Sequence, residues 1–173
     1  MIDYLILPAG ILCSFSRYYL EELPLEEWNN VIEVNLTGVM LCMQMFYPLL
    51  KNSEQGAIVT YSSEQVSRPI PKSAPYLISK AGIEALTKLA ALEFMSSGIR
   101  VNCIRAATVD TNFLSTYVKE PEIRKQMRDD MDKKMPFGII SAENIANLTW
   151  LIASDYSNKI TGQIITIDSG ILL

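Results

Sequence analysis

Short apolar runs alternate along this chain with long amphipathic segments, and this alternation restricts the fold more than any other feature. Four runs are expected to be strands: 3–7, 56–63, 99–104 and 163–168. The β-branched residues of "AIVT" and "IITI" support strands over buried helices. The four runs are continuously apolar, as strands are when helices cover both faces of a parallel sheet. Helical periodicity marks the segments between them, at 24–52, 74–97, 120–134 and 141–154, the last with Ser141 as N-cap. The sequence therefore predicts an α/β fold, a partial doubly wound parallel sheet of about four strands with helices on both faces.

Two of the expected helices are apolar on more than one side. One stripe at helical spacing in segment 24–52 comprises Trp28, Ile32, Val39, Met43, Phe46 and Leu50, and one in segment 74–97 comprises Ile78, Gly82, Ala85, Leu89 and Leu92. Further apolar residues flank both stripes. We therefore expect each helix to cover the sheet with one side and a second subunit with the other, giving a homo-oligomer (a dimer or tetramer).

Length and charge exclude several classes of protein. A chain of 173 residues is long enough for one domain with a core. Its net charge of −4, without any basic run, argues against nucleic acid or an anionic membrane as partner. No segment reaches the roughly 18 apolar residues of a membrane span. Cys13, Cys42 and Cys103 are widely spaced and odd in number, which favours reduced thiols in the cytoplasm over disulfides or a metal site.

The chain contains no histidine, so acid and base chemistry must use Tyr, Lys, Asp, Glu or Cys. Tyr76 and Lys80 lie four positions apart near the start of an expected helix, where both project from one face. A tyrosine titrates near pH 10, and a neighbouring ammonium would stabilise its anion. The alternative is a solvated stripe of charge, because Lys80, Glu84 and Lys88 repeat every four residues.

Asn35 and Ser63 are the other informative polar residues. Asn35 lies on an apolar helical stripe, where its amide must find hydrogen-bond partners, and taken alone it is interpreted as a satisfied core asparagine. Ser62 and Ser63 end the strand 56–63, at the sheet edge where open parallel sheets bind ligands, although strand-ending hydroxyls are common. Ser63 precedes Tyr76 by thirteen residues, and Asn35 precedes Ser63 by twenty-eight.

These residues at these spacings resemble the short-chain dehydrogenase/reductase family. The matching segments are "VIEVNLTGV" with Asn35, "IVTYSS" with Ser63, "YLISK" with Tyr76 and Lys80, "GIRVNCI" and the closing "ASDYSNKITGQIITIDSG". The resemblance extends over residues 3–170. It implies a Rossmann-like domain and an oxidoreductase that uses NAD or NADP to transfer hydride between the nicotinamide and a small alcohol or carbonyl substrate.

The resemblance also implies roles for individual residues. Tyr76 would exchange a proton with the substrate oxygen, and Lys80 would lower the tyrosine pKa and hold the nicotinamide ribose. Ser63 would hydrogen-bond the substrate oxygen, and Asn35 would order a water that relays protons to the lysine. The implied cofactor-binding residues are Ala9, Gly10, Asn35, Tyr76, Lys80, Ala106, Ala107, Val109 and Thr111.

The chain differs from the family pattern at the cofactor side. It contains no G-x-G-x-x-G, and 1–173 is interpreted as a single domain that begins at the family's fourth strand, the first three strands being absent. The family's Asn-Asn-Ala-Gly appears as Leu-Pro-Ala-Gly at 7–10, and its Pro-Gly as Ala106 and Ala107, which is expected to place a Cβ toward the nicotinamide. The residue that selects NAD or NADP lies in the missing region.

Two alternative functions remain open from the sequence. The missing glycine-rich loop favours a non-catalytic fragment of the family that acts as an interaction or regulatory protein through its apolar helices. A more distant alternative is a hydrolase that uses Ser63 and Lys80, although no nucleophile elbow is present. Residues 112–137 resemble the family's variable substrate loop and do not identify a substrate.

Overall fold

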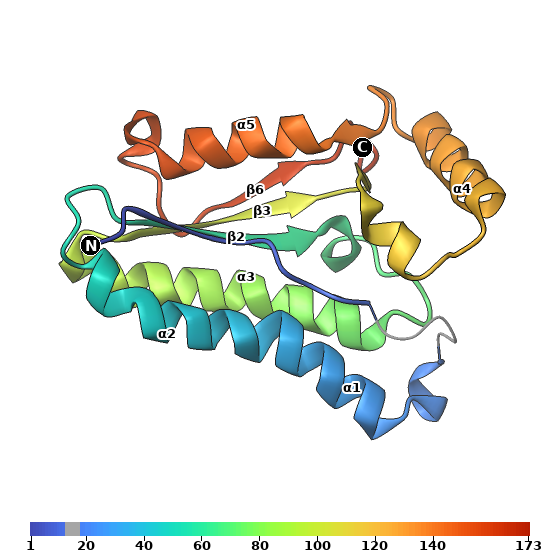
Figure 1. Cartoon of the computed structure of the whole chain (residues 1–173), viewed down its shortest axis with the longest axis horizontal. Helices are drawn as coiled ribbons and strands as arrows, with labels where there is room; N and C mark the ends of the chain where they lie inside the picture. The colour runs from blue at the N-terminus through green and yellow to red at the C-terminus, as the bar shows by residue number, and fades with distance from the viewer. Residues whose placement is uncertain (13–17) are drawn as a thin grey trace.

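A parallel sheet of four strands forms the centre of the molecule in a computed structural model that describes residues 1–12 and 18–173. The strands are β1 (Tyr4–Leu7), β2 (Ala57–Ser63), β3 (Arg100–Ala106) and β6 (Ile164–Ile167), in the order β1-β2-β3-β6. Ile58 pairs with Leu5 on one side and with Val101 on the other. All pairs are parallel, so every strand ends at the same edge (Figure 1). The predicted α/β fold is confirmed.

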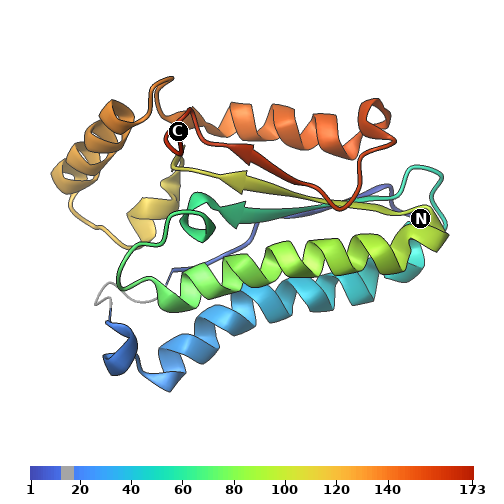
Figure 2. The same ribbon diagram turned by 180° about the vertical axis from the view of Figure 1, so that it is seen from behind.

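Helices cover both faces of this sheet, as the apolar strands predict. One face carries α1 (Leu25–Ile32), α2 (Gly38–Leu50) and α3 (Ala74–Phe94), and the other carries α5 (Ala142–Ala153) (Figures 1 and 2). The N-cap predicted at Ser141 is confirmed, because its hydroxyl accepts a hydrogen bond of 3.1 Å from the Asn144 backbone N–H.

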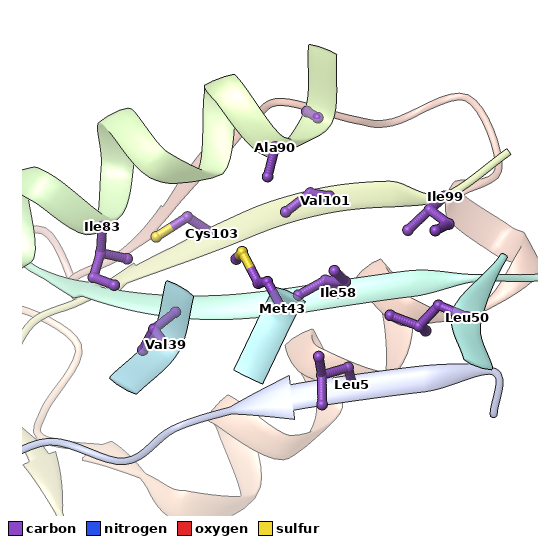
Figure 3. Packing of buried hydrophobic residues seen from close by; sticks show 11 residues of the cluster. Leu5, Val39, Met43, Leu50, Ile58, Ile83, Ala90, Ile99, Val101 and Cys103 are labelled. Atoms are coloured by element: carbon purple, nitrogen blue, oxygen red, sulfur yellow. The ribbon is translucent and has the colours of Figure 1, made fainter. Parts of the chain in front are cut away.

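Each face of the sheet has its own hydrophobic core. Beneath α2 and α3 the core residues include Met43, Ile58, Ile83 and Val101, which converge from helices and strands in Figure 3. Beneath α5 a smaller cluster is formed by Val59, Ile104, Ile152 and Ala153. Successive strand residues alternate between these two cores, which is why the strands are apolar on both sides.

The predicted helix 24–52 is interrupted in its middle. Residues Glu33–Thr37 form a π-helical segment, η2, between α1 and α2. The wider turn lies where the buried polar side chain of Asn35 replaces an apolar one. Such a bulge changes hydrogen bonding without changing the apolar pattern, so the periodicity alone does not reveal it.

Short elements complete the chain before and after β3. A two-stranded parallel sheet of β4 (Val109–Asp110) and β5 (Ile140–Ser141) flanks helix α4 (Pro121–Lys134), and the sequence does not predict it. The 3₁₀ turns are η1 (Leu20–Glu22), η3 (Glu64–Val66), η4 (Met95–Ser97), η5 (Asn112–Thr116) and η6 (Asp155–Ser157). Within the described ranges, no helix is long and apolar enough to cross a membrane.

The predicted free thiols lie in different settings. Cys103 is buried in β3 and Cys42 is half-buried on α2, and both are free. Cys13 lies outside the described residues.

Candidate active site

The site is built where the strands end. Ser63 is the last residue of β2, and α3 returns antiparallel to the strands, so its first turns lie beside the same edge (Figure 1). This placement brings Tyr76 and Lys80 of α3 to the end of β2. The carboxyl edge of an open parallel sheet is where ligands bind.

Tyr76 interacts with the strand end through Ser63. Burial raises the pKa of Tyr76 to about 12, a hydrogen bond with Ser63 acts in the opposite direction, and the charge of Glu64 and the phenol of Tyr117 add to the increase. Tyr76 is therefore protonated at neutral pH. The expected lowering of the tyrosine pKa by the lysine is not what the structure shows, because the cost of burying the tyrosinate is larger.

Lys80 is almost completely buried, with 5% of its surface exposed. Its Nζ donates a hydrogen bond of 3.0 Å to the backbone carbonyl of Tyr61 and lies 5.6 Å from the centre of the Tyr76 ring. Burial lowers the pKa of Lys80 to about 8. The ammonium thus remains charged at neutral pH, at a site where the charge is costly.

The alternative of a solvated charge stripe is wrong for two of its three members. Besides Lys80, Glu84 also turns toward the sheet, where it forms a bidentate ion pair with Arg105 at 2.8 and 2.6 Å. Ser62 donates a 2.7 Å hydrogen bond to the same carboxylate. Only Lys88 is exposed. The ion pair fixes α3 against the ends of β2 and β3.

Asn35 holds the loop that follows β1. It is fully buried, with 0% exposure. Its Oδ1 accepts from the Ile11 N–H at 2.7 Å, and its Nδ2 donates to the Ile11 carbonyl at 2.9 Å and to Ser79 Oγ at 3.1 Å. Both amide protons are therefore used inside the protein, as the interpretation of a satisfied core asparagine requires.

The predicted cofactor residues after β1 lie next to the lysine. Ala9 and Gly10 are in the loop that Asn35 holds. A Cβ placed on Gly10 would lie 3.3 Å from Lys80 Nζ and 3.4 Å from Asn35 Oδ1. A side chain at this position would therefore crowd the ammonium and the asparagine amide.

The predicted cofactor residues after β3 have different surroundings. Ala106 pairs with Ser63 across the sheet and packs on the cluster beneath α5, and Ala107 packs against Met135 and Ile140. Both methyl groups are thus part of the hydrophobic packing. Val109 is half-buried in β4, and Thr111 is exposed and accepts a 3.3 Å hydrogen bond from the Phe113 N–H.

The structure adds two residues that the sequence analysis did not single out. Glu64 is buried directly after Ser63, and its Oε2 accepts a 2.8 Å hydrogen bond from the Ser63 hydroxyl. Tyr117 comes from the expected substrate loop, and its Oη accepts from the Leu12 N–H at 2.7 Å. The sequence offered one signal for Glu64, which is that it directly follows Ser63 at the end of an expected strand. Nothing in the local sequence indicates that Tyr117 reaches Leu12.

The arrangement does not support a serine–lysine nucleophile. The lysine of such a pair must accept the serine proton. Here Ser63 donates to Glu64, whereas Lys80 donates to the Tyr61 carbonyl.

Known proteins are similar to this chain in both sequence and fold. The family model described as "Enoyl-(Acyl carrier protein) reductase" matches residues 1–172. The 3beta-hydroxysteroid dehydrogenase 1 of Eggerthella lenta is 36% identical over 151 residues, which are 86% of this chain and 56% of that protein. The 3-oxoacyl-[acyl-carrier-protein] reductase FabG of Thermotoga maritima is 34% identical over 173 residues, 99% of this chain and 67% of that protein.

A solved structure superimposes over nearly all of the chain. The 3-ketoacyl-(acyl-carrier-protein) reductase of Brucella melitensis, complexed with NADH, gives a TM-score of 0.84 at 26% identity and covers 99% of this chain and 68% of that one. The chain thus spans from just over half to about two thirds of the length of these relatives.

Proposed function

The chain belongs to the short-chain dehydrogenase/reductase family, and we propose that its site catalyses NAD(P)-dependent oxidoreduction of a small alcohol or carbonyl compound. The observation that supports this most is the meeting of Ser63, Tyr76 and Lys80 at the carboxyl edge of the sheet. A carbonyl that accepts hydride also needs a proton, and Tyr76 is the phenol placed to give it.

Each residue of the site has a proposed role in this reaction. Tyr76, protonated at neutral pH, donates its proton to the substrate oxygen in the reductive direction. Lys80 adds a positive charge 5.6 Å from the Tyr76 ring, which favours transient negative charge on the phenolate. Asn35 positions the loop of Ala9 and Gly10 over the lysine. The substrate oxygen is expected to bind within reach of Tyr76 and Ser63.

The residues present fit the nicotinamide end of a dinucleotide. Lys80 uses one donor on Tyr61, and Gly10 places no side chain against its ammonium, so its other donors could be offered to the hydroxyl groups of a ribose. When bound, the nicotinamide supplies or accepts the hydride. Lys80, Tyr76, Gly10, Val109 and Thr111 are the proposed contacts, and the preference for NAD or NADP stays open.

The comparisons do not favour the non-catalytic alternative, since the relatives are named as dehydrogenases or reductases. We also propose a cytoplasmic location and a homo-oligomer formed through α2 and α3. The latter rests on exposed apolar side chains and a shallow groove of about 340 Å³ between these helices, with Met40, Tyr47, Leu86 and Leu89 among its lining residues.

Calorimetric titration of the purified chain with NADH and NADPH tests the cofactor assignment. We expect saturable heat with at least one of them, and its loss in Lys80→Met, because this variant has no ammonium for the ribose. Lys88→Met removes an exposed lysine of the same helix and should bind as the wild type does. A folded wild-type sample that gives heat with neither nucleotide would contradict the proposal.

A further inference from the structure

Two loops from distant parts of the chain carry proposed cofactor contacts. The β1 loop, residues 8–12, follows β1 and contains Gly10, and the β3 loop, residues 107–119, follows β3 and contains Val109. Strands β1 and β3 lie on either side of β2, which ends at Ser63. The two loops therefore leave the sheet on both sides of the proposed site, at the edge where open parallel sheets bind ligands.

A hydrogen bond of Tyr117 joins these two loops. The Leu12 N–H donates to Tyr117 Oη at 2.7 Å, across 105 positions of the sequence. This distance is at the short end of the range for N–H···O hydrogen bonds. The bond links the β3 side of the sheet edge to the β1 side, and we call it the Tyr117 bridge.

The Leu12 end of the bridge is fixed by Asn35. Directly before Leu12, the Ile11 N–H donates to Asn35 Oδ1 at 2.7 Å, and the Ile11 carbonyl accepts from Asn35 Nδ2 at 2.9 Å. Asn35 is itself fully buried in η2. The β1 loop thus offers the Leu12 N–H from a backbone that the helical layer already holds.

The Tyr117 end is fixed by its own segment and by α4. The Tyr117 ring packs edge-to-face on Phe113, with 5.6 Å between the ring centroids. The next residue, Val118, is 3% exposed, and its carbonyl accepts a 2.7 Å hydrogen bond from Arg124 of α4. The η5 turn that precedes Tyr117 lies beside η3 at the strand ends in both views (Figures 1 and 2). The phenol therefore reaches the β1 loop from an anchored segment.

We propose that Tyr117 is a positioning residue that holds the β1 loop against the β3 loop and so fixes the two sides of the nicotinamide site relative to each other. The inference rests on the proposed function and adds a role in retaining the cofactor. A nucleotide bound between the loops can leave once they separate, and the Tyr117 bridge opposes this separation. Loss of the bridge should therefore speed the release of the nucleotide.

Hydrogen exchange of the Leu12 amide, followed by NMR in the purified chain, tests the bridge without cofactor or substrate. Tyr117→Phe removes the acceptor oxygen and retains the ring that packs on Phe113. We expect the Leu12 amide to exchange roughly 2- to 10-fold faster in this variant, which corresponds to the loss of one hydrogen bond. Tyr156→Phe removes the hydroxyl of a residue that is 85% exposed and should leave this exchange unchanged.

Two results of the exchange measurement would overturn the inference. The first is equal Leu12 exchange in the wild type and in Tyr117→Phe, with circular dichroism showing that the variant is folded. The second needs no variant: a Leu12 amide that exchanges in the wild type as fast as in an unstructured peptide is not held by the bridge.

Stopped-flow fluorescence of NADH and NADPH then measures the effect on cofactor release. We expect the dissociation rate to rise by roughly 2- to 10-fold in Tyr117→Phe and to stay unchanged in Tyr156→Phe. If Tyr117 only stabilised its own segment, the melting temperature would fall and the dissociation rate would not change, which would overturn the inference. A wild type that binds neither nucleotide would contradict the proposed function, and the Leu12 exchange would then decide alone whether the bridge holds the two loops.

Discussion

Lys80 has surroundings very different from those of a free lysine side chain, because it is almost completely buried. Its pKa falls from 10.5 to about 8 because the ammonium is buried. Between these two pH values the unfolded chain binds more protons than the folded one, so the stability of the wild type gains from rising pH in this window. Below pH 8 the folded state carries the full cost of the buried charge.

We therefore expect Lys80→Met to be more stable than the wild type at pH 7, by up to about 3 kcal/mol. The difference should shrink between pH 8 and 10.5, as the wild-type lysine loses its charge. Urea unfolding at pH 7 and near pH 10 measures it, and Lys88→Met controls for helix propensity. Tyr76 and Cys103 have pKa values of about 12 and about 11, above this window, so both stay mainly protonated at the two pH values compared. A variant that is less stable at pH 7 would show that the ammonium stabilises the fold.

At the residue scale the sequence predicted which side chains meet but not how they interact. Ser63, Tyr76 and Lys80 come together because their spacing fits a strand end and one helical face. The sequence does not reveal how deeply the polar side chains of this site are buried. Burial reverses the expected direction of the Tyr76 pKa and removes Lys80 and Glu84 from the solvent. Both effects depend on packing between segments distant in sequence, which periodicity does not encode.

At the scale of elements, the strands and the helices α3, α4 and α5 follow their sequence patterns to within a few residues. The π-helical segment η2 and the small sheet of β4 and β5 were missed. Both arise from tertiary hydrogen bonds, the first around Asn35 and Ile11 and the second between residues 109–110 and 140–141. The proposed site includes both, because η2 carries Asn35, which holds the loop of Gly10, and β4 carries Val109, a proposed cofactor contact.

At the scale of the whole molecule, the apolar outer faces of α2 and α3 are the most direct sign of self-association. Met45 is 72% exposed and Leu92 is 68% exposed, and a groove between the two helices is lined by further apolar residues. Such surface is rarely left to solvent. The two-sided apolar pattern of both helices predicts it from the sequence.

The double variant Met45→Glu/Leu92→Glu should therefore convert an oligomer into a monomer, because four glutamates would meet in each two-fold interface. Light scattering at micromolar concentration measures the mass. Tyr156→Glu places the same charge on a residue outside these helices that is 85% exposed, and it should leave the oligomer intact. A wild-type chain that is monomeric under these conditions would show that the faces are not a stable interface.

The proton transfer by Tyr76 is the central claim, and turnover of Tyr76→Phe tests it most directly. Consumption of NADH or NADPH is followed with 3-oxoacyl thioesters and 3-oxosteroids, carbonyl compounds chosen from the names of the relatives. We predict that the wild type turns over at least one of them and that Tyr76→Phe, folded and still binding the nucleotide, loses about 10²–10⁴-fold in kcat. Unchanged turnover in Tyr76→Phe would contradict the account.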